Sequence, residues 1–188
     1  MRLLLATRNP HKVREFAALL APHDVDPLHA SVMLPPETGE TFAENALEKA
    51  RAAAAATGRI AIADDSGIEA SALGGVPGVR SARYAGEHAS DEENLAKLLR
   101  EAPSGSPLAY VCALAYVAPD STEHVAEGRC TGRLADRPRG TGGFGYDPAF
   151  VPDDRDDGRT MAELEPAAKD AISHRGRAAR ALLAWLER

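Results

Sequence analysis

The chain of 188 residues lacks several features that mark other classes of protein. It has only two cysteines, Cys112 and Cys130, and their spacing matches no metal-ligand motif. We expect both to be buried thiols within strands. No apolar stretch approaches the ~20 residues that a helix needs to cross a bilayer. The N-terminal stretch at residues 1–6 is too short for a signal peptide and leads directly into a polar motif. These absences predict a cytoplasmic protein with no membrane partner.

Positive charge and aromatic residues are also scarce. The net charge is −6, which argues against a general nucleic-acid binder because such proteins need a basic field. One polyanionic ligand, held by local cations and a metal, stays compatible with this charge. Aromatic residues make up only 5% of the chain, so each one in a loop is of interest.

What is present indicates a globular protein. Hydrophobic residues make up 44%, and the length suffices for one domain with a sizeable core or for two small lobes. No internal repeat, low-complexity segment or clear linker divides the chain. We therefore treat residues 1–188 as one domain of two lobes, whose boundaries the sequence does not assign.

Strand and helix signals alternate at both ends of the chain. Residues 2–6 read as a strand, and Asn9 is a plausible N-cap of a helix starting at Pro10. Capping boxes predict two further helices, one from Thr41 that ends at Gly58 and one from Ser90. A last helix closes the chain, and a strand near 28–33 is possible. The alternation favours an α/β fold with a mixed sheet.

Two β-rich runs lie in the middle of the chain, at 108–118 and 123–133. Asp120 and Ser121 support a turn between them. We expect the two runs to form an antiparallel pair.

Two adjacent carboxylates, Asp64 and Asp65, follow an apolar run at 60–63 that suits a buried strand. Charges at the end of such a strand are costly unless something compensates them. A hard divalent cation would do so, because Mg²⁺ binds oxygen ligands. Glu37, in a turn before a helix, could approach as a third oxygen ligand. The alternative is an ordinary acidic turn, since Asp, Ser and Gly all favour turns.

Residues 7–12 are a polar turn between a strand and a helix N-terminus. Free backbone N–H groups and the helix dipole favour phosphate at such a place. Thr7 and Asn9 add polar side chains, and Lys12 adds a positive charge. The turn is not a Walker motif, because its glycines and Lys-Ser/Thr pair are missing. The alternative is a capped surface helix with an exposed lysine.

A glycine-rich loop at 140–148 surrounds Phe144 and Tyr146. These rings could stack on a base, and Asp147 could fix the loop or accept a hydrogen bond. Alternatively, the aromatic side chains simply cover the core.

Lys169, His174 and Arg175 lie within seven residues at the start of the last helix. They would suit phosphates or the polar edge of a base. The alternative is a basic helix terminus paired with nearby acids. Together, the four segments describe a nucleotide site with a phosphate cradle, an acidic metal site, a stacking loop and a polar recognition cluster.

Six motifs resemble the inosine triphosphate pyrophosphatase family, whose bacterial members are XTP/dITP diphosphatases. In chain order they are Thr7-Arg8-Asn9-Pro10-His11-Lys12, Thr41-Phe42-Ala43-Glu44-Asn45-Ala46, Ala63-Asp64-Asp65-Ser66-Gly67, Ser81-Ala82-Arg83-Tyr84, Gly142-Gly143-Phe144-Gly145-Tyr146-Asp147-Pro148 and Ala171-Ile172-Ser173-His174-Arg175-Gly176. The resemblance implies Mg²⁺-dependent hydrolysis of ITP, dITP and XTP to the monophosphate and pyrophosphate. It also implies a homodimer and a mixed α/β fold of two lobes around a central cleft.

The resemblance assigns roles to individual residues. Asp65 would be proton acceptor and metal ligand, with Glu37 as the second ligand, although Glu40 is an alternative, and Asp64 in support. The residues implied in substrate binding are Thr7, Arg8, Asn9, Pro10, His11, Lys12, Ser66, Phe144, Gly145, Tyr146, Asp147, Lys169, His174 and Arg175.

Overall fold

The computed structural model describes all 188 residues, which form two compact units. The first unit contains residues 1–65, 112–128 and 175–188. The second contains residues 66–111 and 129–174. The chain therefore passes between the units four times, and two of these passages fall directly after Asp65 and directly after His174.

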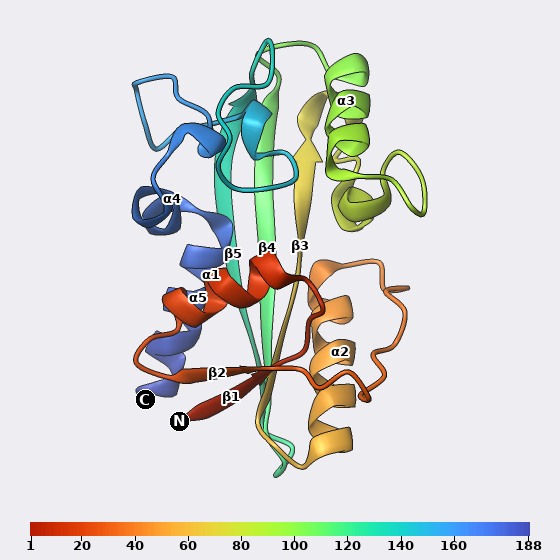
Figure 1. Cartoon of the computed structure of the whole chain (residues 1–188), viewed down its shortest axis with the longest axis vertical. Coiled ribbons are helices and arrows are strands. Elements are labelled where there is room, and N and C mark those ends of the chain that lie inside the picture. The colour runs from red at the N-terminus through yellow and green to blue at the C-terminus, as the bar shows by residue number, and fades with distance from the viewer. The chain divides into compact units, whose positions relative to one another are not determined.

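Six strands form one sheet in the order β2-β1-β3-β4-β5-β6, and Figure 1 labels β1 to β5. They are β1 (Arg2–Leu5), β2 (Asp24–Pro27), β3 (Ala61–Ala70), β4 (Pro107–Val117), β5 (Glu123–Leu134) and β6 (Phe150–Pro152). β1 runs parallel to both β2 and β3, whereas β5 and β6 are antiparallel. The sheet is therefore mixed, as the alternation of elements predicts.

β4 and β5 are neighbours in the sheet and are joined by a short turn. The N–H of Ala118 donates to the carbonyl of Thr122 at 2.9 Å and closes it. A parallel pair would need a connection of roughly a dozen residues or more, so the pair is antiparallel. This confirms the hairpin predicted from Asp120 and Ser121.

The first unit packs helices against its part of the sheet. Its helices are α1 (Pro10–Leu19), α2 (Phe42–Thr57) and α5 (His174–Leu186), of which His174 alone belongs to the second unit. Leu3, Leu5, Phe16, Ile62 and Leu182 are all 0% exposed in its core. The predicted helix ends are confirmed: Asn9 caps α1, and Gly58 ends α2 with a φ of 63°.

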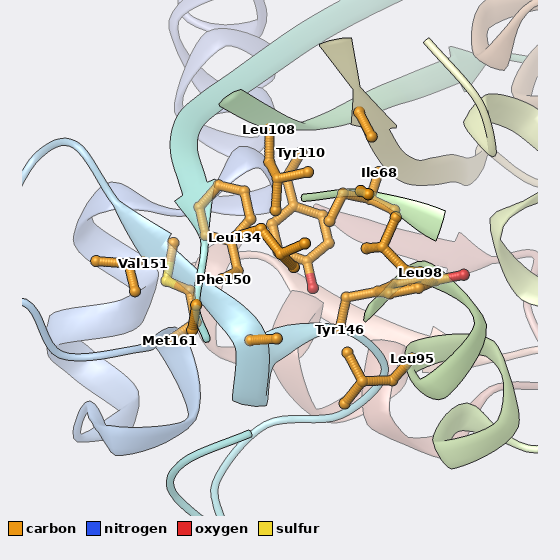
Figure 2. Close-up of a cluster of buried hydrophobic side chains, with 14 of the residues drawn as sticks. Ile68, Leu95, Leu98, Leu108, Tyr110, Leu134, Tyr146, Phe150, Val151 and Met161 are labelled. Carbon is orange, nitrogen blue, oxygen red and sulfur yellow. The ribbon is translucent and has the colours of Figure 1, made fainter. Parts of the chain in front are cut away.

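The second unit has its own core, which Figure 2 shows in close-up. Its helices are α3 (Asp91–Glu101) and α4 (Pro166–Ile172), and four short 3-10 turns accompany them. The labelled side chains of the core are Ile68, Leu95, Leu98, Leu108, Tyr110, Leu134, Tyr146, Phe150, Val151 and Met161.

No helix of the protein combines the length and the apolar character that crossing a membrane requires.

Two expectations about strands are wrong. Residues 28–33 form no strand, because β2 lies earlier in the chain and ends at Pro27. β3 does not end at the carboxylates but continues through Asp64 and Asp65 to Ala70. Side chains from other elements compensate both charges, so the strand needs no turn at this point.

The two cysteines are free and buried, as expected. Cys112 on β4 belongs to the core of the first unit, and Cys130 on β5 belongs to that of the second. Burial raises the pKa of the Cys112 thiol far above its ordinary range. Cys112 is therefore held as a neutral thiol.

Candidate active site

Asp65 lies in the middle of β3 and is only 5% exposed. The Asn45 side-chain amide donates to its Oδ2 at 2.8 Å. The Lys49 ammonium lies 3.9 Å from its Oδ1 and also contacts the Glu37 carboxylate. Asn45 and Lys49 come from successive turns of α2. That helix therefore places an amide and a cation on the same carboxylate.

Burial is the main influence on the Asp65 carboxyl, and it raises its pKa. The Lys49 ammonium and the Asn45 hydrogen bond act in the opposite direction, while the nearby Glu37 carboxylate adds to the rise. Burial disfavours the charged form of Lys49, but Asp64, Glu37 and Asp65 outweigh it and raise the pKa of this ammonium. Lys49 is thus held as a cation among carboxylates.

Asp64, the neighbour of Asp65, has different partners. Its Oδ2 lies 2.8 Å from the Lys12 ammonium of α1 and 3.7 Å from Nε of Arg175 on α5. Burial alone would raise its pKa, but Lys12, Arg175 and Lys49 together lower it to about 2. Asp64 therefore pairs with cations, and its supporting role at a metal stays a prediction.

The turn at residues 7–12 is a capped helix start, and its use as an anion site stays a prediction. Asn9 Oδ1 accepts the N–H groups of His11 at 2.9 Å and Lys12 at 3.4 Å, and Pro10 occupies the first turn of α1. Thr7 Oγ1 accepts the N–H of Asn9 at 3.2 Å. These bonds fix the turn so that Lys12 faces Asp64.

Two side chains of this turn have partners outside the acidic site. The Arg8 guanidinium donates to the carbonyls of Ala30 at 3.2 Å and Val32 at 2.8 Å. The exposed His11 ring lies 2.8 Å from the Arg14 guanidinium. Arg8 thus holds the segment that follows β2, and its role in substrate binding stays a prediction, as does that of His11.

Glu37 and Asp65 are the carboxylates that could hold a metal ion, and the magnesium site stays a prediction. Both carboxylates approach the single ammonium of Lys49, so both can reach one cation. No group of three or more His, Cys, Asp or Glu side chains is placed to hold a metal. Proteins usually bind Mg²⁺ through one or two carboxylates, while water and phosphate complete the shell. Glu40 is exposed, and no contact joins its side chain to Asp65 or Lys49.

Asp147 is the centre of a second polar cluster, within the second unit. It is 3% exposed, and its Oδ2 accepts from the Lys169 ammonium at 2.8 Å and from the N–H of Phe144 at 3.0 Å. Its Oδ1 accepts from the Tyr110 hydroxyl at 3.1 Å. Gly143 has a φ of 67°, and a Cβ there would lie 2.0 Å from Asp147 Oδ2. The carboxylate therefore fixes the glycine-rich loop, as predicted for Asp147.

The two aromatic residues of this loop differ in how deeply they are buried. Tyr146 is 6% exposed, packs in the core shown in Figure 2, and donates its hydroxyl to the carbonyl of Ser81 at 2.7 Å. Its ring covers the core and is not available to stack on a base, so this half of the stacking expectation is corrected. Phe144 is half-buried and has the Lys169 ammonium 5.4 Å from its ring centroid. Gly145 donates its N–H to Asp91 at 2.9 Å.

His174 joins the second cluster through Tyr110. The two rings stack with centroids 4.5 Å apart and planes 6° from parallel. Tyr110 therefore contacts both His174 and Asp147. Ser66, the first residue of the second unit, is half-buried on β3 directly after Asp65.

The structure adds residues that the sequence argument missed, above all Asn45 and Lys49. The signal that could have found them is their position, because both lie on the buried stripe of α2 with Ala46, Ala50 and Ala53. A lysine and an asparagine in such a stripe need buried partners. Tyr110 gave no signal, since it lies in a continuous apolar strand.

Comparison with known proteins decides the family. The model of the Ham1 family matches residues 3–185. The chain belongs to the Ham1 family. A dITP/XTP pyrophosphatase from Streptomyces coelicolor is 50% identical over 97% of this chain and 95% of its own length. One from Geobacillus kaustophilus is also 50% identical, over 94% of this chain and 89% of its own.

Solved structures agree with the fold of this Ham1-family chain. A HAM1 protein from Coxiella burnetii has a TM-score of 0.88 and 40% identity, and the match covers 100% of this chain and 98% of that one. A nucleoside-triphosphatase or dITP/XTP pyrophosphatase from Mycobacterium abscessus has a TM-score of 0.75 and 46% identity. The match covers 97% of this chain and 99% of that one. The resemblance seen in the sequence motifs is therefore confirmed at the level of the family and of the mixed α/β fold.

Proposed function

We propose that the protein hydrolyses ITP, dITP and XTP to the monophosphate and pyrophosphate, with Mg²⁺ as cofactor, and so clears these nucleotides before they enter DNA and RNA. The observation that carries the proposal is the buried Asp65 carboxylate, which Asn45 binds and which shares a cation with Glu37. The dITP/XTP pyrophosphatase names of relatives at 50% identity support the choice of substrate.

In the proposed reaction, water attacks the α-phosphorus, and the bond from this phosphorus to the bridging oxygen breaks. Mg²⁺ at Glu37 and Asp65 would neutralise charge on the phosphate oxygens and make the attacking water more acidic. Asp65 orients the water and accepts its proton. An ordinary aspartate, with a pKa of about 3.9, is a poor base at neutral pH. Burial raises the pKa of Asp65, whereas a bound Mg²⁺ would lower it, so Asp65 would act mainly by positioning the water.

The departing pyrophosphate needs positive charge. We propose that Lys12 and the positive end of the α1 helix dipole hold it, since the dipole of a helix favours anions at its N-terminus. Asp64 keeps the ammonium of Lys12 in place at 2.8 Å. The Lys12 ammonium therefore loses little freedom when a polyphosphate arrives.

We propose that the second cluster recognises the purine. Phe144 stacks on the base, and donors among Lys169, His174 and Arg175 pair with the 6-oxo group of hypoxanthine and xanthine. Adenine has a 6-amino donor at this position, which would face donors and remain unpaired. A polar mismatch of this kind can cost orders of magnitude in kcat/KM.

The test is an assay of pyrophosphate and phosphate release with ITP, XTP, GTP and ATP, with and without Mg²⁺. We expect pyrophosphate from ITP and XTP, much slower turnover of ATP, and no turnover without the metal. Equal rates with ITP and ATP would refute the scheme of base recognition. Release of phosphate would show that another bond breaks, and binding of ITP without turnover would indicate a nucleotide sensor.

The Asp65→Asn variant tests the central residue. It removes the charge and the proton acceptor while keeping the shape of the side chain, so turnover should be lost and the circular dichroism spectrum and Tm retained. Near-normal rates in this variant would show that Asp65 is not the essential carboxylate.

We further propose that the protein is a homodimer and acts in the cytoplasm, in keeping with the family resemblance of its motifs. Light scattering after gel filtration measures the assembly directly, and a mass near 19.9 kDa would contradict the dimer.

A further inference from the structure

Two helices of the protein begin with the same local pattern. α2 starts with a capping box between Thr41 and Glu44, and α3 starts with one between Ser90 and Glu93. In each helix the next residue is a buried asparagine. Asn45 is 1% exposed and Asn94 is 2% exposed. The two asparagines therefore occupy equivalent positions in two different units.

Both asparagines accept a hydrogen bond from the loop before their helix. Oδ1 of Asn45 accepts the N–H of Gly39 at 2.8 Å, and Oδ1 of Asn94 accepts the N–H of Ala85 at 2.7 Å. These bonds fix which side of each amide is the acceptor, because a backbone N–H only donates. The amino group of each asparagine must therefore be the donor to its second partner.

The second partners differ in kind. Asn94 donates to a backbone carbonyl, that of Ala82, at 3.1 Å, which serves the fold alone. Asn45 donates to the Asp65 carboxylate at 2.8 Å. Asn45 thus engages Oδ2 of Asp65, and Oδ1 is the oxygen on the side of Lys49.

Asn45 also connects Asp65 to the segment that carries Glu37. Gly39, whose N–H it accepts, lies two residues after Glu37. The approach is so close that a Cβ at Gly39 would lie 2.8 Å from Asn45 Oδ1 and 2.9 Å from Glu44 Cβ. One buried amide therefore links the Asp65 carboxylate to the segment that carries Glu37.

We propose that Asn45 is a positioning residue, which orients the Asp65 carboxylate and sets its place relative to Glu37. Because the hydrogen bond from Asn45 restricts rotation of the Asp65 carboxylate, this side chain would lose less freedom when an ion and substrate bind. The inference rests on the proposed function for the roles of Asp65 and Glu37. Nothing in it requires Asn45 to touch the nucleotide.

Asn45→Ala and Asn94→Ala form a matched pair for the test, since both remove a buried amide with two partners. Residues that orient metal ligands typically cost about 10–100-fold in affinity or activity when they are mutated. We expect kcat with ITP to fall by this amount in Asn45→Ala with a smaller change in KM. Asn94→Ala should lower Tm comparably but keep kcat within about threefold of the wild type.

Affinity for Mn²⁺, followed by the electron paramagnetic resonance signal of the free ion without nucleotide, gives a readout independent of turnover. It should weaken in Asn45→Ala and stay unchanged in Asn94→Ala. Equal behaviour of the two variants, in kcat and in Mn²⁺ affinity, would overturn the proposal and leave Asn45 a structural residue. If the wild type does not hydrolyse ITP, the proposed function fails while the Mn²⁺ comparison still decides the role of Asn45.

Gly39→Ala is a second probe in case Asn45→Ala does not fold. It leaves Asn45 chemically intact but displaces its amide through the close contact of the added Cβ. Weaker Mn²⁺ binding in this variant supports the proposal, and unchanged Mn²⁺ binding together with unchanged kcat contradicts it.

Discussion

Adjacent aspartates on one strand meet opposite environments in this protein. Successive side chains of a strand point to opposite faces of the sheet. Asp64 therefore meets Lys12 and Arg175, whereas Asp65 meets Asn45 and Lys49. The pKa of Asp64 is lowered and that of Asp65 is raised. The two adjacent aspartates thus differ in role, since Asp64 pairs with cations and Asp65 is a candidate base.

At the scale of single residues, Glu37 and Glu40 allow a direct test of the second metal ligand. Glu37→Gln should raise the Mg²⁺ concentration for half-maximal activity by at least about tenfold, since even residues that only orient metal ligands can cost that much. Glu40 is exposed, so Glu40→Gln is the matched control and should leave the Mg²⁺ titration unchanged. The reverse result would assign the ligand to Glu40.

Substitutions of Phe144 and Tyr146 should also have different effects, the first on substrate binding and the second on stability. A stacked base contributes about 1–3 kcal/mol, so Phe144→Ala should raise the KM for ITP by about 5- to 150-fold with little change in Tm. Tyr146→Phe removes the donor to the carbonyl of Ser81 and should cost about 1–3 kcal/mol of stability, with KM unchanged. Kinetics and thermal melts of both variants test this, and a large KM effect in Tyr146→Phe would contradict our account.

At the scale of elements, local signals predicted the helices well. The ends of α1, α2 and α3 depend on caps formed by residues next to one another in the sequence. The length of β3 could not be predicted in this way. It continues through two charges only because Lys12, Lys49 and Arg175 come from three different helices.

One contact between elements gives a pH dependence. His124 on β5 stacks on Trp185 of α5, with centroids 4.4 Å apart and planes 5° from parallel. Burial, and then the charge of Arg188, lower the pKa of His124 below its ordinary value of about 6.5. The folded protein therefore prefers the neutral ring. The contribution of His124 to stability is full above pH ~6.5 and falls as pH drops through the lowered pKa.

The measurement for this contact compares the wild type with His124→Gln. The stability difference between them, from urea melts, should be larger at pH 7.5 than at pH 5.5. A titration of the His124 ring by NMR should give a pKa below that of an unfolded peptide. A pKa above 6.5, or a stability difference that grows on acidification, would show that the stack favours the protonated ring.

At the scale of the whole molecule, sequence patterns predicted the mixed sheet, the helix positions and the segments that carry the candidate site. They did not predict which groups within those segments meet. Tyr146 looked as free to stack as Phe144, because its burial depends on Ser81, 65 residues away. Asn45 and Lys49 went unnoticed because Asp65, the carboxylate that both contact, lies 20 and 16 residues further along the chain.

The two buried thiols, one in each unit, can be used to measure local opening of the protein. Alkylation requires exposure and a thiolate, so Cys112 and Cys130 should react only when their surroundings open. β3, β4 and β5 each continue from one unit into the other, so we expect both thiols to become reactive with the same opening free energy. Mass spectrometry of the two peptides after timed labelling would measure this, and unequal opening would show that each unit can unfold alone. A cysteine introduced at exposed Met33 could meanwhile be labelled selectively, with both natural thiols left in place.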